Sequence, residues 1–375
     1  MKIVADDKIP FLKGVLEPFA DVIYIPGKDI SREHLIEADA LITRTRTKCD
    51  ESLLKGTKVK FIATATIGFD HIDTKWCENN GIQWTNAPGC NSGSVYQYIA
   101  SVLALLAIKY NFNFTDRTIG VIGVGNVGKK VVRLAENLGM RVLLNDPPRA
   151  REEGICGFVS MDGILRECDI ITCHVPLNME GEDKTYHLID EKLLGKISKG
   201  AILINSSRGE VVDNNALRLY LENSGNLLAT VLDVWENEPD IDSQLLDKLD
   251  IATPHIAGYS MDGKINGTAM SVQAVSRFFN LPLKMWVPED IPIPENPEIS
   301  ISCKGKSDQD IICEAILSTY NAQKDDAILR NSIETFEKQR GNYGFRREFR
   351  AYSIKLTDSQ TNVGSVLKNL GFHII

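Results

Sequence analysis

The stretch TIGVIGVGNVGKKVVRLAENLGMRVLLNDPP, residues 118–148, decides the fold of this chain. Its pattern predicts a strand, a glycine-rich turn at 123–128, a helix and a second strand. In such a turn Gly123 permits the sharp change of direction, Gly125 lets a phosphate approach the backbone, and Gly128 lets the helix pack closely on the strand. The stretch therefore predicts a βαβ unit that binds a dinucleotide at the helix N-terminus.

An acidic residue, Asp146, closes the second strand of this unit. A carboxylate at that position accepts hydrogen bonds from the adenosine ribose hydroxyls and repels a 2′-phosphate, which favours NAD over NADP. Arg149 lies close by in the sequence and weakens this preference. The alternative interpretation of Asp146 is a solvated turn residue before two prolines.

Short apolar runs alternate with helical patterns in two series along the chain. The expected strands are 2–5, 22–25, 40–43 and 61–65 in the first series, and 118–122, 141–145, 170–173, 201–205 and 228–232 in the second. A polar helical stretch at 31–38 lies within the first series, and a long apolar helix at 94–109 separates the two. Alternation of this kind predicts an α/β protein with two doubly wound parallel-sheet domains of the Rossmann or flavodoxin type.

The amino-acid composition changes after residue 287, where four prolines fall within ten residues and indicate a semi-rigid linker. Beyond it we expect a strand at 299–302, a helix at 308–320, a charged segment, a strand at 349–356 and a helix at 359–370. These elements predict a small C-terminal α+β domain with a modest core of its own.

The bulk composition, with 375 residues, 43% hydrophobic and 25% charged, is typical of a globular protein of two or three domains. No run approaches the roughly 20 apolar residues that span a bilayer, and acidic residues stand where a secretory signal would be apolar. A net charge of −8 argues against nucleic acid as a partner. The eight scattered cysteines lack a C-x-x-C pair and indicate buried thiols rather than a metal site. We expect a cytoplasmic protein.

Three polar residues follow apolar runs downstream of the glycine turn: Arg208, Glu238 and His255. Ligands of open α/β sheets bind at the carboxyl ends of strands. Oxidation of a 2-hydroxy acid needs a base for the hydroxyl proton while the C–H hydrogen leaves as hydride, and histidine suits that role. A carboxylate orients the ring, and an arginine binds the substrate carboxylate. Singly, the three also fit a surface ion pair, a helix-start residue and a loop histidine; together they favour a dehydrogenase.

The segments NSSRGEVVD, LDVWENEP and TPHIAG resemble the signature of the D-isomer-specific 2-hydroxyacid dehydrogenases. The resemblance implies that Arg208, Glu238 and His255 are catalytic and that NAD is the cofactor. It also implies a split substrate-binding domain (1–93 and 257–286), an NAD-binding domain (94–256) and a C-terminal domain (287–375). The implied nucleotide contacts are Gly123, Gly125, Asn126, Val127, Gly128, Asp146, Val175, Ser206, Ser207, Arg208, Asp233 and Gly258.

In one respect the chain departs from that family, because its Arg208-to-Glu238 spacing is one residue longer than we expect. The loop at 222–226 is the expected place of the extra residue. A longer surface loop costs little free energy.

The segments RTRTK, TATIGFDHID and HIAGYSMDGK resemble one branch of the family, whose substrate carries a carboxylate and a phosphate and whose added C-terminal domain forms a homodimer. The resemblance implies substrate contacts by Thr45, Thr66 and Tyr259, although the two threonines also fit ordinary strand positions. Arg44 and Arg46 follow a strand end and add positive charge. We interpret a further cluster, Arg346, Arg347 and Arg350, as a solvated or dimer-interface patch rather than a phosphate site reached from a partner subunit.

Two alternatives remain open at this point. One is a dehydrogenase of the 3-phosphoglycerate type or one for another 2-hydroxy acid. The other is a non-enzymatic NAD-sensing corepressor or scaffold on the same fold, which would tolerate loss of the catalytic set. The presence of Arg208, Glu238 and His255 disfavours the scaffold.

Overall fold

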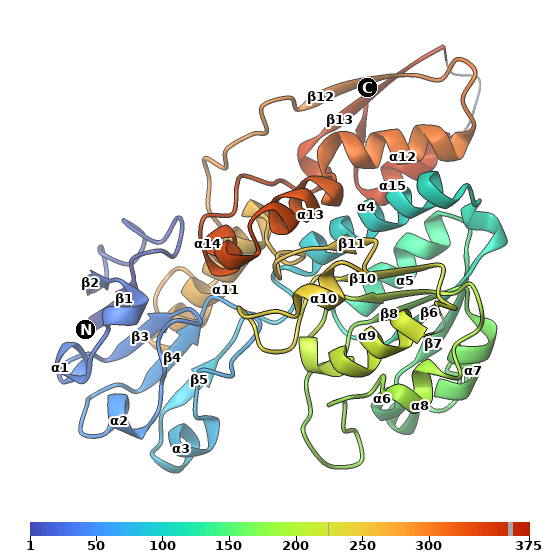
Figure 1. The fold of residues 1–375 in the computed structure, drawn as a ribbon. Helices are drawn as coiled ribbons and strands as arrows, with labels where there is room; N and C mark the ends of the chain where they lie inside the picture. The colour runs from blue at the N-terminus through green and yellow to red at the C-terminus, as the bar shows by residue number, and fades with distance from the viewer. Residues whose placement is uncertain (224, 359–362) are drawn as a thin grey trace. The chain divides into compact units, whose positions relative to one another are not determined.

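The computed structural model describes residues 1–223, 225–358 and 363–375 and divides the chain into two compact units (Figure 1). The first unit consists of Met1–Asn91 and Ser260–Pro292, and the second of Ser92–Tyr259 and Ile293–Ile375. Each unit is built around a parallel sheet with helices packed against it. The division into three domains that the sequence suggests stays a prediction.

The first unit contains a five-stranded parallel sheet of order β2-β1-β3-β4-β5, the flavodoxin-like order. Apolar residues point alternately to its two faces and form two separate cores. Its strands are β1 (Lys2–Asp6), β2 (Asp21–Ile25), β3 (Ala40–Thr43), β4 (Phe61–Thr64) and β5 (Gln83–Thr85), and its helices α1 (Arg32–Leu35), α2 (Glu51–Leu54), α3 (Thr74–Asn79) and α11 (Met261–Phe278).

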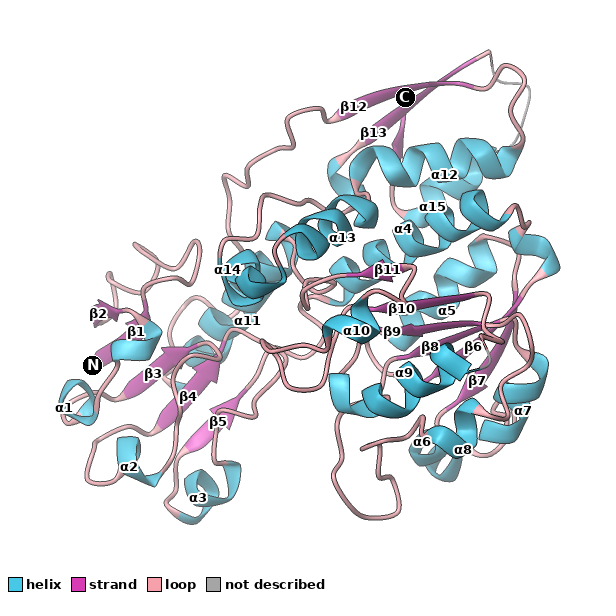
Figure 2. Cartoon of the chain, viewed as in Figure 1, coloured by secondary structure: helices cyan, strands magenta, loops and turns pink. Residues whose placement is uncertain are grey.

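The second unit contains a six-stranded parallel sheet of order β11-β10-β9-β8-β6-β7, so the strand order reverses between β6 and β8. Figure 2 shows its strands alternating with helices along the chain. The strands are β6 (Thr118–Ile122), β7 (Arg141–Asn145), β8 (Ile170–Cys173), β9 (Ile202–Asn205), β10 (Ala229–Leu232) and β11 (Ile251–Ala252). The helices of this part are α4 (Ser92–Tyr110), α5 (Gly128–Asn137), α6 (Pro147–Glu153), α7 (Met161–Glu167), α8 (Glu191–Leu194), α9 (Asn214–Asn223) and α10 (Ser243–Leu246).

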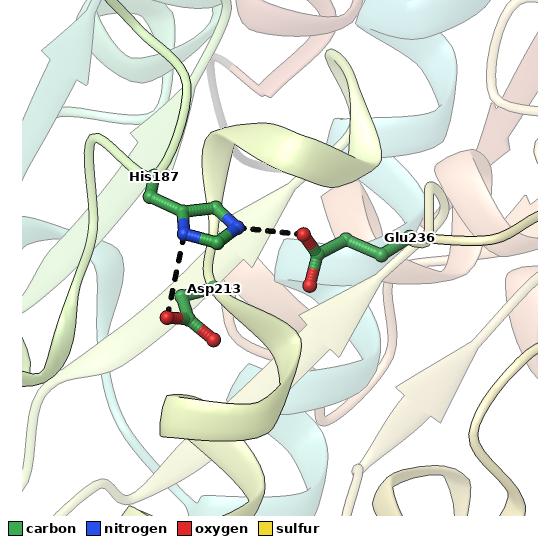
Figure 3. A group of neighbouring side chains, drawn as sticks. All are labelled: His187, Asp213 and Glu236. Carbon is green, nitrogen blue, oxygen red and sulfur yellow. Dashed lines mark hydrogen bonds and ion pairs between the residues drawn. The ribbon is translucent and has the colours of Figure 1, made fainter.

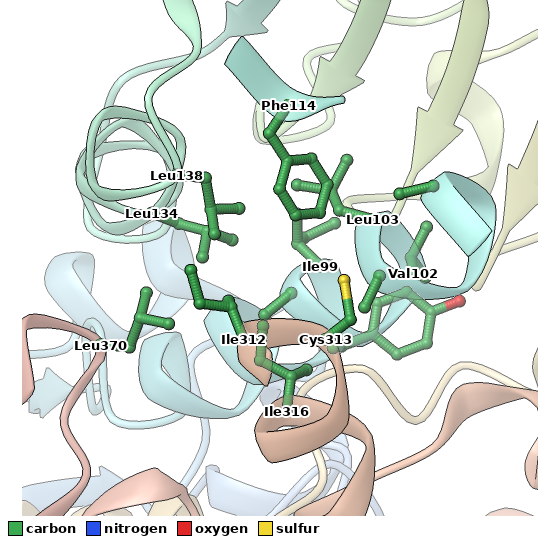
Figure 4. Close-up of a cluster of buried hydrophobic side chains, with 14 of the residues drawn as sticks. Ile99, Val102, Leu103, Phe114, Leu134, Leu138, Ile312, Cys313, Ile316 and Leu370 are labelled. Atoms are coloured by element: carbon green, nitrogen blue, oxygen red, sulfur yellow. The ribbon is translucent and has the colours of Figure 1, made fainter. Parts of the chain in front are cut away.

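Among its described residues, the C-terminal segment of the second unit forms a three-stranded parallel sheet with four helices. These elements are β12 (Glu298–Ser302), α12 (Asp308–Thr319), α13 (Ala322–Asn331), α14 (Phe336–Gly341), β13 (Ser353–Thr357), α15 (Val363–Leu370) and β14 (His373–Ile374). Helix α12 packs on α4, and both contribute to one buried apolar cluster together with α5 (Figure 4). The C-terminal segment therefore shares its core with the six-stranded sheet.

The prediction of an α/β fold is confirmed, and each strand expected in the two large sheets lies within one residue of its predicted ends. The helix expected at 31–38 is shorter, Arg32–Leu35. The strand expected at 349–356 is wrong at its start, because Phe349–Ala351 form a 3₁₀ turn and β13 begins at Ser353. The first residues of the helix expected at 359–370 lie outside the described residues, as does part of the loop at 222–226.

Within the described residues, no helix combines the length and the apolar character needed to cross a membrane.

Because the C-terminal segment shares this core, we expect Ile316→Ala to destabilise the whole second unit. Ile316 is fully buried in α12, and truncation of such a side chain costs about 3 kcal/mol. Ile328→Ala is the matched control, since Ile328 is 53% exposed and its truncation costs below about 0.5 kcal/mol. Urea unfolding measures both. An equal loss of unfolding free energy in the two variants would contradict the shared core.

Candidate active site

The glycine turn between β6 and α5 is shaped to receive a ligand. Gly123 has a φ of 84°, and a Cβ there would lie 2.6 Å from the carbonyl oxygen of His174. A Cβ on Gly128 would lie 2.0 Å from the carbonyl oxygen of Gly123. A Cβ on Gly125, in contrast, would meet nothing within 4 Å among the described atoms. Two glycines thus close the turn against β8 and α5, and the third leaves open space where a pyrophosphate approaches.

Asp146 lies at the end of β7 and is tied to this turn. Its carboxylate accepts hydrogen bonds from the backbone N–H of Val124 (2.8 Å) and of Arg149 (3.1 Å). The Arg149 guanidinium donates to the Val124 carbonyl at 2.7 Å and pairs with Glu153 at 2.6 Å. Because Glu153 offsets its charge, Arg149 is poorly placed to attract a 2′-phosphate, which agrees with a preference for NAD.

Val175 packs against the glycine turn, and the loop after β9 lies at the same edge of the sheet. A Cβ on Gly123 would lie 2.8 Å from Val175 Cγ1, so this side chain packs against the turn. After β9, Asn205 Oδ1 accepts hydrogen bonds from the backbone and hydroxyl of Ser207, at 3.1 and 2.8 Å. Ser206 Oγ is buried and has no hydrogen-bond partner among the described residues. An orphaned hydroxyl at the same edge of the sheet as the open glycine turn fits a bound dinucleotide.

Arg208, Asp233 and His255 follow the adjacent strands β9, β10 and β11, as the sequence predicts. The Asp233 carboxylate is 1% exposed and accepts three hydrogen bonds, from Thr253 Oγ1 (2.6 Å) and from the N–H groups of Ile256 (2.8 Å) and Ala257 (2.9 Å). Burial raises the pKa of Asp233 despite these donors. Asp233 therefore fixes the turn that carries His255.

The structure brings Glu238 and His255 together. His255 Nδ1 lies 2.8 Å from Glu238 Oε2 and 3.1 Å from Oε1, and Oε1 also accepts from the Trp235 N–H at 3.0 Å. Burial by itself would raise the pKa of Glu238, but the hydrogen bond and charge of His255, together with Arg340, hold it below its usual range. His255 has a φ of 55°, a left-handed conformation that costs a non-glycine residue free energy. The longer spacing before Glu238 thus leaves the pair intact.

In the first unit, the residues expected to bind substrate follow β3 and β4, whose carboxyl ends are adjacent. Arg44 pairs with the buried Asp6 at 3.1 Å, while Thr45 and Arg46 are exposed. The Thr66 hydroxyl bonds the Gly68 carbonyl at 2.9 Å. The structure adds one cation that the sequence reasoning missed: Lys264 of α11, whose pKa is lowered by partial burial and by the charge of Arg44.

Tyr259, Asn126, Val127 and Gly258 lie on the second unit. Gly258 and Tyr259 directly follow the turn held by Asp233, and the Tyr259 ring meets that of Tyr343 edge to face at 5.9 Å. Asn126 is exposed and Val127 half-buried in the glycine turn.

The interpretation of the C-terminal arginines as a solvated patch is wrong for two of them, while a dimer interface at this cluster stays a prediction. Arg346 and Arg347 are 5% and 7% exposed, so they do not form a solvated patch, whereas Arg350 is exposed. Arg346 donates to carbonyl groups beside the active site and stacks on Tyr320. A buried guanidinium needs such partners, and backbone carbonyls and aromatic rings provide them.

A further cluster that the sequence reasoning missed surrounds His187 (Figure 3). His187 Nε2 lies 2.7 Å from Glu236 Oε1, and Nδ1 lies 3.4 Å from Asp213 Oδ2. Each carboxylate faces a different nitrogen of the imidazole ring. A metal ion would bind only one of these nitrogens, so the arrangement fits a histidine held between two carboxylates better than a metal site. Glu236 also accepts from the Asn214 N–H at 3.0 Å. The cluster anchors the loop at Glu236, two residues before Glu238. In the sequence, the only sign of this cluster was the acidic LDVWENEP segment.

Comparison with known proteins agrees with this geometry. Residues 108–257 match the family model "D-isomer specific 2-hydroxyacid dehydrogenase, NAD binding domain", and residues 291–371 match a domain of unknown function, DUF3410. The chain is 52% identical over 355 residues to the erythronate-4-phosphate dehydrogenase of Bacteroides thetaiotaomicron, which covers 94% of this chain and 99% of the relative. The chain belongs to the erythronate-4-phosphate dehydrogenase family. The predicted resemblance is confirmed.

Solved structures of related dehydrogenases have the same fold. D-lactate dehydrogenase from Aquifex aeolicus, complexed with NAD and lactic acid, is 28% identical with a TM-score of 0.60 and covers 75% of this chain and 96% of its own. NAD+-bound 3-phosphoglycerate dehydrogenase from Entamoeba histolytica is 27% identical with a TM-score of 0.62 and covers 78% and 99%. The chain is an NAD-dependent oxidoreductase acting on a CH–OH group, and the prediction of NAD as cofactor is confirmed.

His174, which follows β8 beside the glycine turn, generates a pH prediction. Burial lowers its pKa to about 3, its Nδ1 is buried without a hydrogen-bond partner among the described residues, and its Nε2 bonds the Thr172 hydroxyl at 2.9 Å. The unfolded chain takes up a proton at this residue below pH 6.5, whereas the folded chain stays neutral there until about pH 3. Stability is therefore lost as pH falls through this window.

We expect the free energy of unfolding of the wild type to fall more steeply between pH 6.5 and 4.5 than that of His174→Gln, by about 1 kcal/mol per pH unit. Glutamine keeps a partner for Thr172 but does not titrate. Urea unfolding at several pH values measures the two slopes, and parallel slopes would show that His174 is not held neutral.

Proposed function

We propose that this chain catalyses the NAD-dependent oxidation of 4-phospho-D-erythronate to (R)-3-hydroxy-2-oxo-4-phosphooxybutanoate, a step of pyridoxal 5′-phosphate biosynthesis. The observation that carries the proposal is the His255–Glu238 pair at 2.8 Å, formed by the loops that follow β10 and β11 of the sheet that carries the glycine turn, in a chain 52% identical to a named erythronate-4-phosphate dehydrogenase. A substrate with a carboxylate and a phosphate suits the arginines at the strand ends.

In this proposal His255 is the general base. Its Nδ1 faces Glu238, so Nε2 is the ring atom that takes the proton of the substrate C2 hydroxyl. Glu238 remains ionised near neutral pH, because its pKa lies below the usual range, and it stabilises the imidazolium that forms. Arg208 binds the substrate carboxylate through its planar guanidinium. NAD+, when bound, would supply the acceptor for the hydride that leaves C2 as His255 takes the hydroxyl proton.

The cofactor site of the proposal consists of the glycine turn, the ribose-binding acid and the strand-end loops. The backbone at Gly125 and the N-terminus of α5 hold the pyrophosphate, and Asp146 holds the adenosine ribose. Ser206 supplies its orphaned hydroxyl. The other residues proposed to contact NAD are Gly123, Asn126, Val127, Gly128, Val175, Ser207, Arg208, Asp233 and Gly258.

Substrate specificity in this proposal depends on hydroxyl and cationic groups. Thr45, Thr66 and Tyr259 bind the hydroxyl-rich chain, and Arg44 and Arg46 bind the phosphate. Lys264 adds a third positive charge near Arg44. The scaffold alternative is not favoured, because a non-enzymatic protein has no use for a half-buried histidine–carboxylate pair whose histidine is held in a strained turn.

We also propose that the chain forms a homodimer through its C-terminal segment and works in the cytoplasm. The branch of the family that it resembles dimerises in this way. Its eight cysteines are free, and seven of them are buried, which suits a reducing compartment.

With 4-phospho-D-erythronate and NAD+ as the only reactants, we expect NADH to form, with a kcat/KM above that for 3-phosphoglycerate. Absorbance at the NADH band measures both rates. A higher kcat/KM for 3-phosphoglycerate would contradict the proposal and identify the chain as a dehydrogenase of the 3-phosphoglycerate type.

His255→Gln removes the base and is expected to lower kcat by about 10²–10⁴-fold with little change in NADH binding. Glu238→Gln keeps an acceptor for the ring but removes the charge, so a loss of roughly tenfold is expected. His373→Gln, at an exposed histidine of β14, is the control and retains wild-type kcat. An unchanged kcat in His255→Gln would refute the assignment of the base.

A further inference from the structure

Two arginines of the C-terminal segment contact the surroundings of the His255–Glu238 pair in the same chain, one at Glu238 itself and one at the turn that carries His255. Arg340, on α14, lies 3.7 Å from Glu238 through its Nη1 and Oε2 of the carboxylate. Arg346, in the loop after α14, donates from Nη2 to the Ala257 carbonyl at 2.7 Å, two residues after His255. Both arginines lie within the domain of unknown function that residues 291–371 match.

Arg346 holds the turn from the side opposite Asp233. Residues Ile256 and Ala257 donate their N–H groups to Asp233, while their carbonyl groups accept from Arg346, at 3.5 and 2.7 Å. Arg346 Nη2 also donates to the Ser94 carbonyl at 3.0 Å. Both peptide edges of the turn are thus bonded, which restrains a backbone segment that contains a strained residue.

An aromatic clamp fixes Arg346 itself. Its guanidinium lies 4.3 Å from the ring centre of Tyr320 and 5.9 Å from that of Tyr343. Both phenol groups donate to the same carboxylate oxygen of Asp325, at 2.8 Å each. Asp325 therefore fixes the orientation of the two rings. The rings in turn hold the buried guanidinium in position by cation–π contact.

Arg340 interacts with Glu238, the carboxylate of the His255–Glu238 pair. It is 22% exposed, and Glu238 is 17% exposed, so water screens their interaction only in part. Glu337, one turn earlier on α14, lies 3.2 Å from Arg340 Nη1 and holds the guanidinium in place. The positive charge favours the ionised form of Glu238 and opposes a second positive charge on the adjacent His255 ring.

We propose that the C-terminal segment is a positioning element of the active site, in which Arg340 holds the ionised Glu238 carboxylate and Arg346 holds the turn that carries His255. This inference rests on the proposed roles of Glu238 and His255. It gives the domain of unknown function a catalytic task within its own chain, in addition to any part in dimerisation.

The groups that face the pair determine how its proton responds to pH. They are Arg340 and Glu337 from α14 and Asp233 at the end of β10. Loss of the Arg340 cation leaves the pair facing acidic groups, so the pair retains its proton to higher pH. A neutral His255 is required in the oxidation direction, and the acid limb of the rate profile therefore moves upward.

The test compares Arg340→Gln, Arg340→Lys and the control Arg330→Gln. Arg330 lies in the same segment and also donates to loop carbonyls, those of Leu246 and Leu249 at 2.8 Å each, but it contacts neither Glu238 nor His255. For Arg340→Gln we expect kcat to fall roughly tenfold, KM for NAD+ to stay unchanged, and the acid limb of kcat/KM to move up by about half a pH unit. In Arg340→Lys we expect the acid limb of the kcat/KM profile to return to its wild-type pH, and in Arg330→Gln we expect it to stay there.

A second readout does not need turnover. Histidine side-chain NMR of labelled protein follows the six rings through a pH titration, and His255→Gln assigns the relevant signal. The His255 signal is expected to change at higher pH in Arg340→Gln than in the wild type and in Arg330→Gln. If the wild type forms no NADH from 4-phospho-D-erythronate, the proposed function fails, and the NMR titration still decides the role of Arg340.

The proposal is overturned if Arg340→Gln keeps the wild-type pH profile and the wild-type His255 titration, even if its melting temperature falls. Arg346→Lys serves as the second variant. A lysine keeps the charge but not the planar fork that reaches the three carbonyls of Ser94, Ile256 and Ala257, so we expect a loss in kcat that exceeds any loss in NADH affinity. Equal kcat in Arg346→Lys and the wild type would remove Arg346 from the proposal.

Discussion

The active site depends on the buried carboxylate of Asp233. An unpaired carboxylate in that environment would cost on the order of several kcal/mol, and the three donors from Thr253, Ile256 and Ala257 offset this cost. The same hydrogen bonds force the chain after β11 into a tight turn, in which His255 takes a φ of 55°. The strain at His255 is tolerated because the surrounding contacts determine the turn from several sides.

The parallel sheet explains why these groups meet. Arg208, Asp233 and His255 stand at the ends of three adjacent strands, and the glycine turn stands at the end of β6, where the strand order reverses. Ligands of open α/β sheets bind at such a point. The loop that carries Glu238 is fixed independently, by the bracketed His187 ring and by Asn214. The fold therefore holds His255 and Glu238, the proposed base and its carboxylate, from separate elements.

Local patterns in the sequence predicted most of the fold and the part of the site that lies on strand ends. The glycine turn, Asp146 and the Arg208, Glu238 and His255 set have fixed neighbours in the chain, so their spacing carries information. The strands β5, β11 and β14 have only two or three residues, too few for a periodic signal. Arg340 and His187 gain their roles from contacts with residues far along the chain, and such contacts leave no local signature.

The error over Arg346 and Arg347 has the same origin. Three arginines within five residues indicate a solvated surface by composition, but two of them are buried, and Arg346 contacts the turn after β11, the start of α4 and the Tyr320 ring. The number of aromatic residues nearby, among them Tyr320 and Tyr343, was the available hint of cation–π contacts.

The most direct measurement is a crystal structure of the chain with NAD+ and 4-phospho-D-erythronate bound. We predict that the pyrophosphate lies over the glycine turn at 123–128, that His255 Nε2 is within hydrogen-bond distance of the C2 hydroxyl, and that Arg208 binds the carboxylate. A substrate whose C2 hydroxyl faces away from His255, or a pyrophosphate bound elsewhere, would contradict the account.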